Sequence, residues 1–214
     1  MRPANPTIVD YGSGNLRSVQ KAFEACGAAA SITTDPQAVA EADLLVLPGV
    51  GAFGDAMKEL SARGLVEPIR RHIAHDRPFL GICMGLQLLF DRGEEGGVAG
   101  DWPKGLGVLE GDVVRFDLPE GVKVPHMGWN RVDWQRRPDG SPPAAAVGDD
   151  AWFYFVHAYH ARPRDESVVL GRTDYSGPFC SAVQRGRLVA TQFHPEKSQR
   201  AGMNLIRWFL ERHG

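Results

Sequence analysis

Pro78-Phe79-Leu80-Gly81-Ile82-Cys83-Met84-Gly85-Leu86-Gln87-Leu88-Leu89-Phe90 is the stretch of this chain that predicts its fold. Phe79 to Ile82 form a brief apolar run of the kind that fills a buried parallel strand. From Leu86 onward the apolar residues predict a buried helix. The stretch is therefore expected to form a strand, a sharp turn at Cys83 and a helix.

Two glycines, Gly81 and Gly85, flank Cys83 at a distance of two residues on either side. This spacing matches the nucleophile elbow G-x-nucleophile-x-G, with cysteine as the nucleophile. Such a nucleophile lies on a strained turn, and side chains two positions away would collide with the crossing backbone. The turn also brings Cys83 to a helix N-terminus, whose partial positive charge favours the thiolate. The competing interpretation is an unreactive thiol in a core strand.

A cysteine nucleophile needs a base, and the segment that ends at Glu196 supplies a candidate. Leu188 to Phe193 have the character of a strand, and His194-Pro195-Glu196 follow. Pro195 biases His194 toward an extended conformation, in which residues two apart face the same way. His194 and Glu196 therefore project together, one as general base and the other as its orienting carboxylate. An exposed surface pair is the alternative interpretation.

Two glycine-containing loops follow predicted strands. The strand Leu44 to Leu47 runs into Pro48-Gly49-Val50-Gly51. Because sites of open α/β sheets lie at the carboxyl ends of strands, this loop is expected to present its backbone to the site; a plain strand-to-helix turn is the alternative. Glycines on both sides of Val50 also permit a peptide flip. The turn Gly12 to Gly14 fails the dinucleotide fingerprint, because Arg17 stands where its third glycine belongs.

The remaining pattern predicts an α/β fold with a mixed, centrally parallel sheet flanked by helices, in one domain over residues 1–214. Helices and strands alternate early and hairpins follow late, which favours parallel strands at the centre and antiparallel additions. His72 and His75 are expected on a solvated helix face. The expected helices are 15–26, 54–63, 65–75 and 204–211. The further expected strands are 7–10, 108–116, 129–134, 152–157, 168–172 and 180–184, with a hairpin turn at 185–187 and loops at 91–107 and 135–150.

The residues from Gly81 to Gln87 and from Phe193 to Ser198 resemble the motifs of class I (triad) glutamine amidotransferases. Four further stretches are similar to a subfamily that serves histidine biosynthesis, and the resemblance runs from about Thr7 to the last helix. These stretches are Asp10-Tyr11-Gly12-Ser13-Gly14-Asn15, Pro48-Gly49-Val50-Gly51-Ala52-Phe53, Pro125-His126-Met127-Gly128-Trp129-Asn130 and Phe153-Tyr154-Phe155-Val156-His157.

The resemblance implies roles for individual residues. The implied catalytic residues are Cys83, His194 and Glu196, and the implied oxyanion donors belong to Val50, Gly51 and Met84. The implied substrate contacts are Gly49, Gln87, His157, Ala158 and Tyr159. The implied partner contacts are Asn15, Met127, Trp129, Asn130 and Lys197, with Trp129 and Asn130 expected in a glycine-broken loop. The family pattern often has a hydroxyl residue where Ala158 stands, so only backbone contacts are expected there.

The implied reaction is hydrolysis of L-glutamine to glutamate and ammonia, without a metal or organic cofactor. The implied partner is a cyclase subunit with a (β/α)8 barrel, in a heterodimer. That subunit uses the ammonia to make imidazole glycerol phosphate and an aminoimidazole carboxamide ribotide. Two alternatives remain at this point. One is a glutaminase of another pathway, such as anthranilate, aminodeoxychorismate or pyridoxal phosphate synthesis. The other is a catalytically silent binding module, or a peptidase-like relative, on the same fold.

The composition limits the other classes of function. The 214 residues carry a formal net charge of −2, so neither nucleic acid nor an anionic membrane is an expected partner. No apolar run approaches the length of a membrane span, and the first residues lack a signal-peptide core. Cys26, Cys83 and Cys180 form no disulfide framework or metal-binding pattern. A reducing cytoplasm is the expected location.

Overall fold

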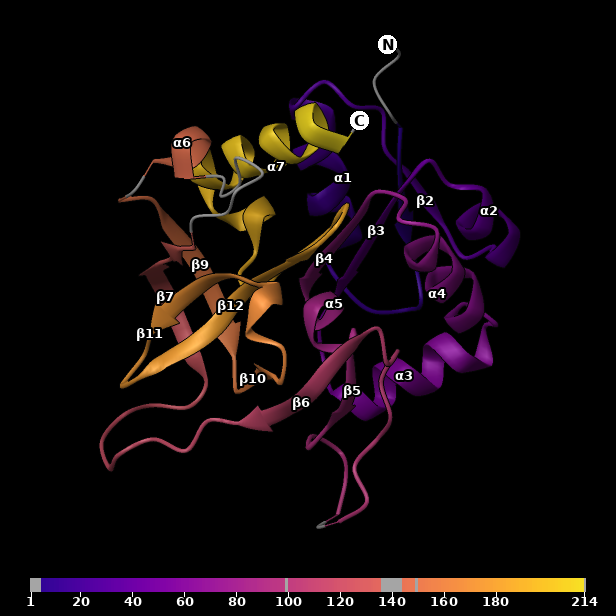
Figure 1. The fold of residues 1–214 in the computed structure, drawn as a ribbon. Helices are drawn as coiled ribbons and strands as arrows, with labels where there is room; N and C mark the ends of the chain where they lie inside the picture. The colour runs from indigo at the N-terminus through magenta and orange to yellow at the C-terminus, as the bar shows by residue number, and fades with distance from the viewer. Residues whose placement is uncertain (1–4, 99, 136–143, 149, 214) are drawn as a thin grey trace.

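The computed structural model describes residues 5–98, 100–135, 144–148 and 150–213. It contains the expected mixed sheet with parallel strands at its centre and helices on both faces (Figure 1). The α-helices are α1 (Leu16–Ala25), α2 (Pro36–Glu41), α3 (Phe53–Ala62), α4 (Val66–Ala74), α5 (Met84–Gln87), α6 (Ala144–Val147) and α7 (Gln199–His213), and the 3-10 turns are η1 (Glu166–Val168) and η2 (Pro195–Lys197).

The strands are β1 (Pro6–Val9), β2 (Ser31–Thr33), β3 (Leu44–Gly49), β4 (Phe79–Cys83), β5 (Phe90–Gly93), β6 (Leu109–Arg115), β7 (His126–Arg131), β8 (Asp133–Trp134), β9 (Trp152–His157), β10 (Tyr159–Pro163), β11 (Val169–Asp174), β12 (Pro178–Arg185) and β13 (Leu188–Thr191). Their order in the main sheet is β2-β1-β3-β4-β13-β12-β10-β6-β5. The run from β2 to β13 is parallel, whereas β12 and β10 pair in antiparallel fashion. Strands β7 and β9 form a separate antiparallel ladder.

Alternate residues of the central strands feed two hydrophobic cores, one on each face of the sheet. In β3, Leu45 and Leu47 pack in one core with buried residues of α3 and α4. Leu44 and Val46 point the other way and pack in the second core with buried residues of α1 and α7. Because side chains of a strand alternate between faces, the continuous apolar run of β3 is what allows helices to cover both sides. The same reasoning applies to β4, which is buried throughout.

The helix expected from Leu86 onward is wrong in length, because α5 ends after one turn and the chain enters β5. The carbonyl of Leu88 accepts a hydrogen bond from the amide of Leu106 at 2.7 Å, and that of Leu89 accepts from Val108 at 2.8 Å. A helix would need those carbonyls for its own amides. A short apolar run is compatible with either a strand or a helix. Here the long-range hydrogen bonds decide the secondary structure after Gln87, and β5 takes up part of the expected 91–107 loop.

Three other expectations are corrected. Strand β10 was not anticipated, because His160 and Arg162 interrupt its apolar pattern. Trp129 and Asn130 lie in β7, paired one-to-one with β9, and not in a loop; the expected strand 129–134 is divided between the end of β7 and β8. His72 is buried, and its Nε2 lies 2.8 Å from the carbonyl oxygen of Pro78, so only His75 belongs to a solvated face.

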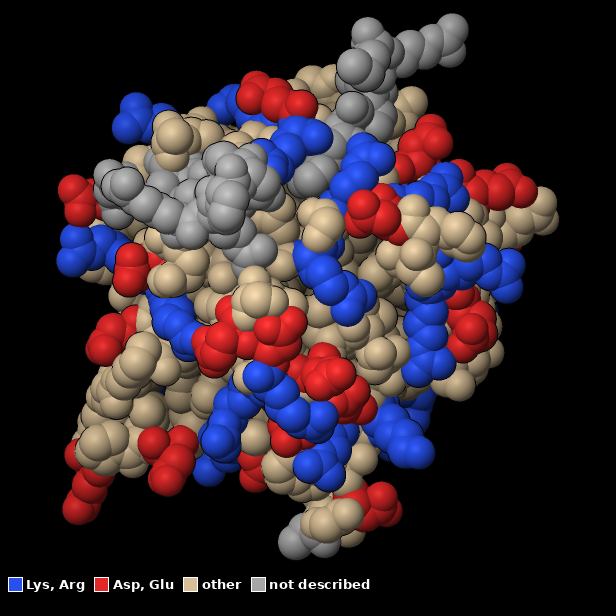
Figure 2. Space-filling model, in the orientation of Figure 1, with Lys and Arg blue, Asp and Glu red and all other residues tan. Residues whose placement is uncertain are grey.

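The other expected elements are confirmed within one or a few residues, including the hairpin turn between β12 and β13. The expected 135–150 connection lies mostly outside the described residues, although α6 falls within it. On the face seen in Figure 2, basic and acidic residues are interspersed, without an extended area of one sign. No helix in the described part of the chain combines the length and the apolar character needed to cross a membrane.

Candidate active site

Cys83 lies at the end of β4 with φ 55° and ψ −104°, a conformation that side chains normally avoid. A Cβ on Gly81 would lie 2.7 Å from the carbonyl oxygen of Gly85, and a Cβ on Gly85 would overlap the carbonyl oxygen of Leu47. The predicted reason for the two glycines, crowding by the crossing backbone, is therefore confirmed. The strained turn ends β4 at Cys83, which pairs with Gly49 at the end of the neighbouring strand β3.

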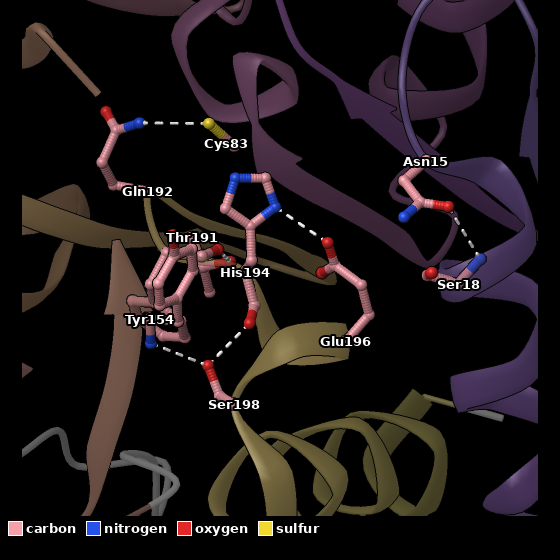
Figure 3. Close-up of polar contacts among 10 residues, drawn as sticks. Asn15, Ser18, Cys83, Tyr154, Thr191, Gln192, His194, Glu196 and Ser198 are labelled. Carbon is pink, nitrogen blue, oxygen red and sulfur yellow. Dashed lines mark hydrogen bonds and ion pairs between the residues drawn. The ribbon is translucent and has the colours of Figure 1, made fainter. Parts of the chain in front are cut away.

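His194 and Glu196 follow β13, the parallel neighbour of β4 in which Thr191 pairs with Ile82. His194 Nδ1 lies 2.8 Å from Glu196 Oε1 (Figure 3), and their side chains are 3% and 2% exposed. The prediction that these two side chains project together is confirmed, but its reason is corrected: only His194 is extended, and Glu196 lies in the 3-10 turn η2. The surface-pair interpretation is wrong. Because parallel strands end at the same edge, the pair reaches Cys83 although more than a hundred residues separate them.

The electrostatics of this group favour a charged imidazole. Burial opposes the charge, but the Cys83 side chain and the Glu196 carboxylate outweigh it and raise the pKa of His194 to about 10. His194 Nε2 is buried and has no hydrogen-bond partner within the described residues. An imidazolium at this position stabilises an adjacent thiolate and holds a proton that it can transfer. The arrangement is suited to nucleophilic attack by sulfur followed by proton transfer.

A cavity of about 250 Å³ opens beside Cys83. It brings together most of the residues expected in the site. Its lining consists of Val50, Gly51, Cys83, Met84, Gln87, Glu95, Val156, His157, Ala158 and Tyr159. Gly49 was expected to contact substrate but does not line this cavity; it packs against the hydroxyl of Tyr11, where a Cβ would overlap.

The loop after β3 is held by its neighbours. The Ser13 hydroxyl donates a hydrogen bond to the carbonyl oxygen of Val50. Gly51 has φ 101°, which favours glycine at this position. Val50 is exposed, and both residues line the cavity next to Cys83 and Met84. The backbone of this loop is therefore close to the nucleophile, as the loop composition predicted, and Ser13 determines the orientation of one of its carbonyls.

Gln87, an expected substrate contact, is 3% exposed and already bonded within the protein. Its side-chain nitrogen donates to the carbonyl oxygen of Tyr159 at 3.0 Å and to Gln192 Oε1 at 3.1 Å. Both hydrogens of the amide are thus engaged. A ligand in the cavity has only the side-chain oxygen of Gln87 as a partner.

Two cavity residues, Glu95 and Val156, were missed by the sequence analysis. Glu95 Oε2 accepts a 2.9 Å hydrogen bond from the amide of Phe53 at the start of α3. Burial is the main cause that raises the pKa of Glu95. Glu95 lies in a segment rich in glycine and charged residues, and nothing in the sequence of that segment indicated a binding site. It supplies a carboxylate to the cavity wall.

The five residues expected to contact a partner fall into two groups. Met127 and Trp129 are 63% and 43% exposed on the outer side of β7. The Trp129 ring packs edge-on against Tyr154, and the Lys197 ammonium lies 5.9 Å from the centre of the Tyr154 ring. We call Met127, Trp129, Tyr154 and Lys197 the aromatic face. The other two have internal bonds: Asn15 accepts from the Ser18 amide at the start of α1, and Asn130 donates to the carbonyl oxygen of Asp174.

The sequence of the chain is similar to those of known proteins. A family model described as glutamine amidotransferase class-I matches residues 7–212. The chain is 55% identical over 203 residues to a protein of Rhodopirellula baltica named imidazole glycerol phosphate synthase subunit HisH, covering 95% of each chain. It is 52% identical over 207 residues to the subunit of the same name from Syntrophotalea carbinolica, covering 94% of this chain and 97% of that one.

A solved structure described as a glutamine amidotransferase superposes with a TM-score of 0.72. The match covers 96% of this chain and 97% of the other, at 24% sequence identity. At that identity the likeness concerns the fold alone. It agrees with the arrangement of sheet and helices described above.

Proposed function

Since the chain belongs to the class-I glutamine amidotransferase family, we propose that it hydrolyses L-glutamine by means of Cys83, His194 and Glu196. The observation that carries this assignment is the buried imidazole–carboxylate pair next to a cysteine on a glycine-flanked elbow. Three separate parts of the family pattern, nucleophile, base and orienting acid, meet at one edge of the sheet. A silent binding module would not need this combination.

In the first half of the reaction, the Cys83 thiolate attacks the side-chain amide carbon of glutamine. The negative charge that develops on the amide oxygen is received by amide hydrogens of Met84 and of the Val50–Gly51 loop, which border the cavity with Cys83. His194 gives its Nε2 proton to the departing nitrogen. The C–N bond breaks, ammonia leaves, and a thioester to Cys83 remains.

In the second half, water attacks the thioester. His194, now neutral, accepts a proton from that water through Nε2, while Glu196 keeps the ring oriented through Nδ1 at 2.8 Å. The C–S bond breaks, its electron pair returns to Cys83, and glutamate is released. The thiolate–imidazolium pair is then restored, and no further reactant is consumed.

Recognition of the amino-acid end of glutamine is assigned to the wall of the cavity that contains Glu95. A carboxylate there is suited to the α-ammonium group of the substrate, because an opposite charge in a partly buried site binds strongly. Gln87 contributes its side-chain oxygen, and His157, Ala158 and Tyr159 line the same cavity. Ala158 has no hydroxyl, so its contacts are limited to backbone atoms.

The chain acts as one subunit of a larger enzyme, as do the relatives named imidazole glycerol phosphate synthase subunit HisH. We assign it the same partner chemistry: a cyclase subunit with a (β/α)8 barrel receives the ammonia. The proposed contact surface is the aromatic face, and we assign Asn15 and Asn130 to the contact as well, although both have internal hydrogen bonds. Identities above 50% over nearly the whole chain favour this assignment over glutaminases of other pathways.

We also place the reaction in the cytoplasm. Cys83 and the other two cysteines are free thiols in the structure. A catalytic thiolate needs a reducing compartment to remain usable.

The test is glutamate production by the purified chain, alone and with the barrel cyclase encoded in the same genome. We expect the two proteins to copurify and glutamate to be released from glutamine in their complex when the cyclase substrate is present. A complex that forms and makes imidazole glycerol phosphate from ammonium salts, but releases no glutamate from glutamine, would contradict the glutaminase assignment. Copurification with a different synthase would contradict the partner assignment alone.

A further inference from the structure

Gln192 is a fully buried glutamine whose side chain reaches the nucleophile. Its Nε2 lies 3.7 Å from Cys83 Sγ, a hydrogen-bond distance to sulfur (Figure 3). Its backbone amide donates to the carbonyl oxygen of Ser181 at 2.8 Å, so the residue is anchored to β12. Neither the catalytic steps described above nor the substrate contacts assign a role to this side chain.

The neighbours of Gln192 determine which end of its amide faces the sulfur. The carbonyl oxygen of Tyr159 can only accept, so Gln87 must present its nitrogen there. The second hydrogen of that same nitrogen is donated to Gln192 Oε1 at 3.1 Å. Gln192 therefore presents its oxygen to Gln87 and its NH2 group to Cys83. The orientation follows from a chain of donors and acceptors that begins at a backbone carbonyl.

A buried N–H group that lacks an acceptor destabilises a protein, and a thiolate is a much better acceptor than a thiol. The NH2 group of Gln192 thus favours the charged form of Cys83 and limits where its sulfur can lie. We propose that Gln192 is a further catalytic residue, which holds Cys83 Sγ for attack and stabilises its negative charge. The role would operate twice, when the thiolate attacks and when the C–S bond breaks and sulfur regains its electron pair.

The position of Gln192 in the sequence agrees with this role. It lies two residues before His194 and four before Glu196, just after the last residue of β13. Gln192 contacts Cys83 itself, and the 3-10 turn η2 that follows His194 brings Glu196 to the imidazole, so one short segment supplies three side chains to the site. This proposal rests on the proposed glutaminase reaction, but the contact with sulfur can be tested without glutamine.

The main test is the pH dependence of alkylation of Cys83 by iodoacetamide in the full chain, followed by peptide mass spectrometry to separate Cys83 from Cys26 and Cys180. Gln192→Met removes the donor and nearly keeps the volume. We expect the midpoint of the pH–rate profile to move upward and the alkylation rate at pH 7 to fall roughly 10-fold or more, since hydrogen bonds to charged groups are strong. Gln184→Met is the matched control, because Gln184 is also a buried glutamine but lies in β12, away from the cavity lining.

Gln192→Glu is the second variant, since its carboxylate can still accept from Gln87 while it places an acceptor in front of the sulfur. It should shift the profile in the same direction as Gln192→Met. In the complex with the cyclase, both variants should lower kcat for glutamine hydrolysis about 10-fold, with KM changed less than about threefold. Folding is checked by circular dichroism and by the melting temperature.

An unchanged alkylation profile in either folded variant would overturn the role of Gln192. If neither variant folds, Gln192 is a structural residue and the proposal also fails. Failure of the glutaminase assignment has a different signature: wild-type complex would release no glutamate, although the alkylation profile could still respond to Gln192. The two proposals are therefore distinguished by the wild-type measurement.

Discussion

Gly49 lies directly opposite Cys83 in the parallel register of β3 and β4. Both strands end at this level, so the loop that follows Gly49 begins beside the nucleophile. A Cβ on Gly49 would overlap the Tyr11 hydroxyl, which leaves glycine as the residue that fits there. Strand pairing, and not a side-chain contact, thus sets the distance between the candidate oxyanion loop and Cys83.

Replacing the nucleophile should separate the two chemistries of the complex. We expect Cys83→Ala to abolish synthesis that depends on glutamine while the cyclase continues to use free ammonium, because only the glutaminase half needs the thiolate. The measurement compares both nitrogen sources in the reconstituted complex. Loss of the ammonium-dependent reaction in an intact complex would show that the two chemistries are not separable.

Removing the charge of Glu95 should weaken binding of glutamine. We expect Glu95→Gln to raise KM about 10-fold or more, with a smaller change in kcat, because the α-ammonium group is bound equally before and during reaction. Glu94→Gln is the control, since Glu94 is the adjacent carboxylate, does not line the cavity, and accepts a hydrogen bond from the Arg115 amide. Equal KM values in wild type and Glu95→Gln would remove Glu95 from the substrate site.

Docking of a partner on the aromatic face should affect His194, because Tyr154 contacts both. Tyr154 carries the ring that contacts Lys197 and Trp129, and its carbonyl oxygen accepts the backbone amide of His194 at 2.9 Å. We expect Lys197→Ala to reduce glutaminase activity that depends on the partner, with little change in melting temperature, because an exposed cation contributes little to folding. Lys58→Ala, which removes an exposed lysine from α3, is the control. Unchanged partner-dependent activity would exclude Lys197 from the interface.

We expect the isolated chain to hydrolyse glutamine very slowly, and we expect a flip of the Val50–Gly51 peptide to raise this activity when the partner binds. Docking that favours the flipped peptide would supply an oxyanion donor, which is worth about 10²–10³ in rate. The Ser13 hydroxyl holds the Val50 carbonyl in its present orientation. We therefore expect Ser13→Ala to raise glutamate production by the isolated chain and to reduce the activation by the cyclase and its substrate.

The possible outcomes answer two questions: whether the partner activates the chain at all, and whether the Val50–Gly51 peptide is the part of the chain that responds. Equal turnover of the wild-type chain alone, in the complex, and in the complex with cyclase substrate would exclude any switch. If the partner activates the chain but Ser13→Ala has no effect on this activation, then the activation occurs through a part of the chain other than the Val50–Gly51 peptide.

The buried histidines should make the fold sensitive to acid. Burial lowers the pKa of His126 to about 4 and that of His157 to about 3. Between those values and the unfolded pKa of about 6.5, the unfolded chain binds more protons. The free energy of unfolding therefore falls as pH decreases below about 6.5. We expect His157→Gln to reduce this slope by up to about 1.4 kcal/mol per pH unit.

The measurement is urea unfolding of the isolated chain at several values between pH 7.5 and pH 4.5. His75→Gln is the control, since His75 is an exposed histidine at the end of α4. A wild-type stability that does not change over this range would contradict the assignment of neutral, buried rings to His126 and His157. The same slope in His157→Gln as in wild type would exclude His157 as a contributor.

The sequence by itself determined the parts of the site whose geometry is local. The glycines around Cys83 and the short step from His194 to Glu196 depend on steric limits within a few residues. The alternation of helices and strands indicated the centrally parallel sheet. Tertiary structure alone decided the contacts between distant segments. It shortened α5, because amides of residues 106–108 take the carbonyls that a longer helix would need, and it brought Glu95, Gln192 and Ser13 to the nucleophile and its loop. Ser13 bonds to a residue 37 positions away, and Gln192 bonds to a residue 109 positions away. No local pattern encodes such contacts, because they depend on which strands pair and in which register.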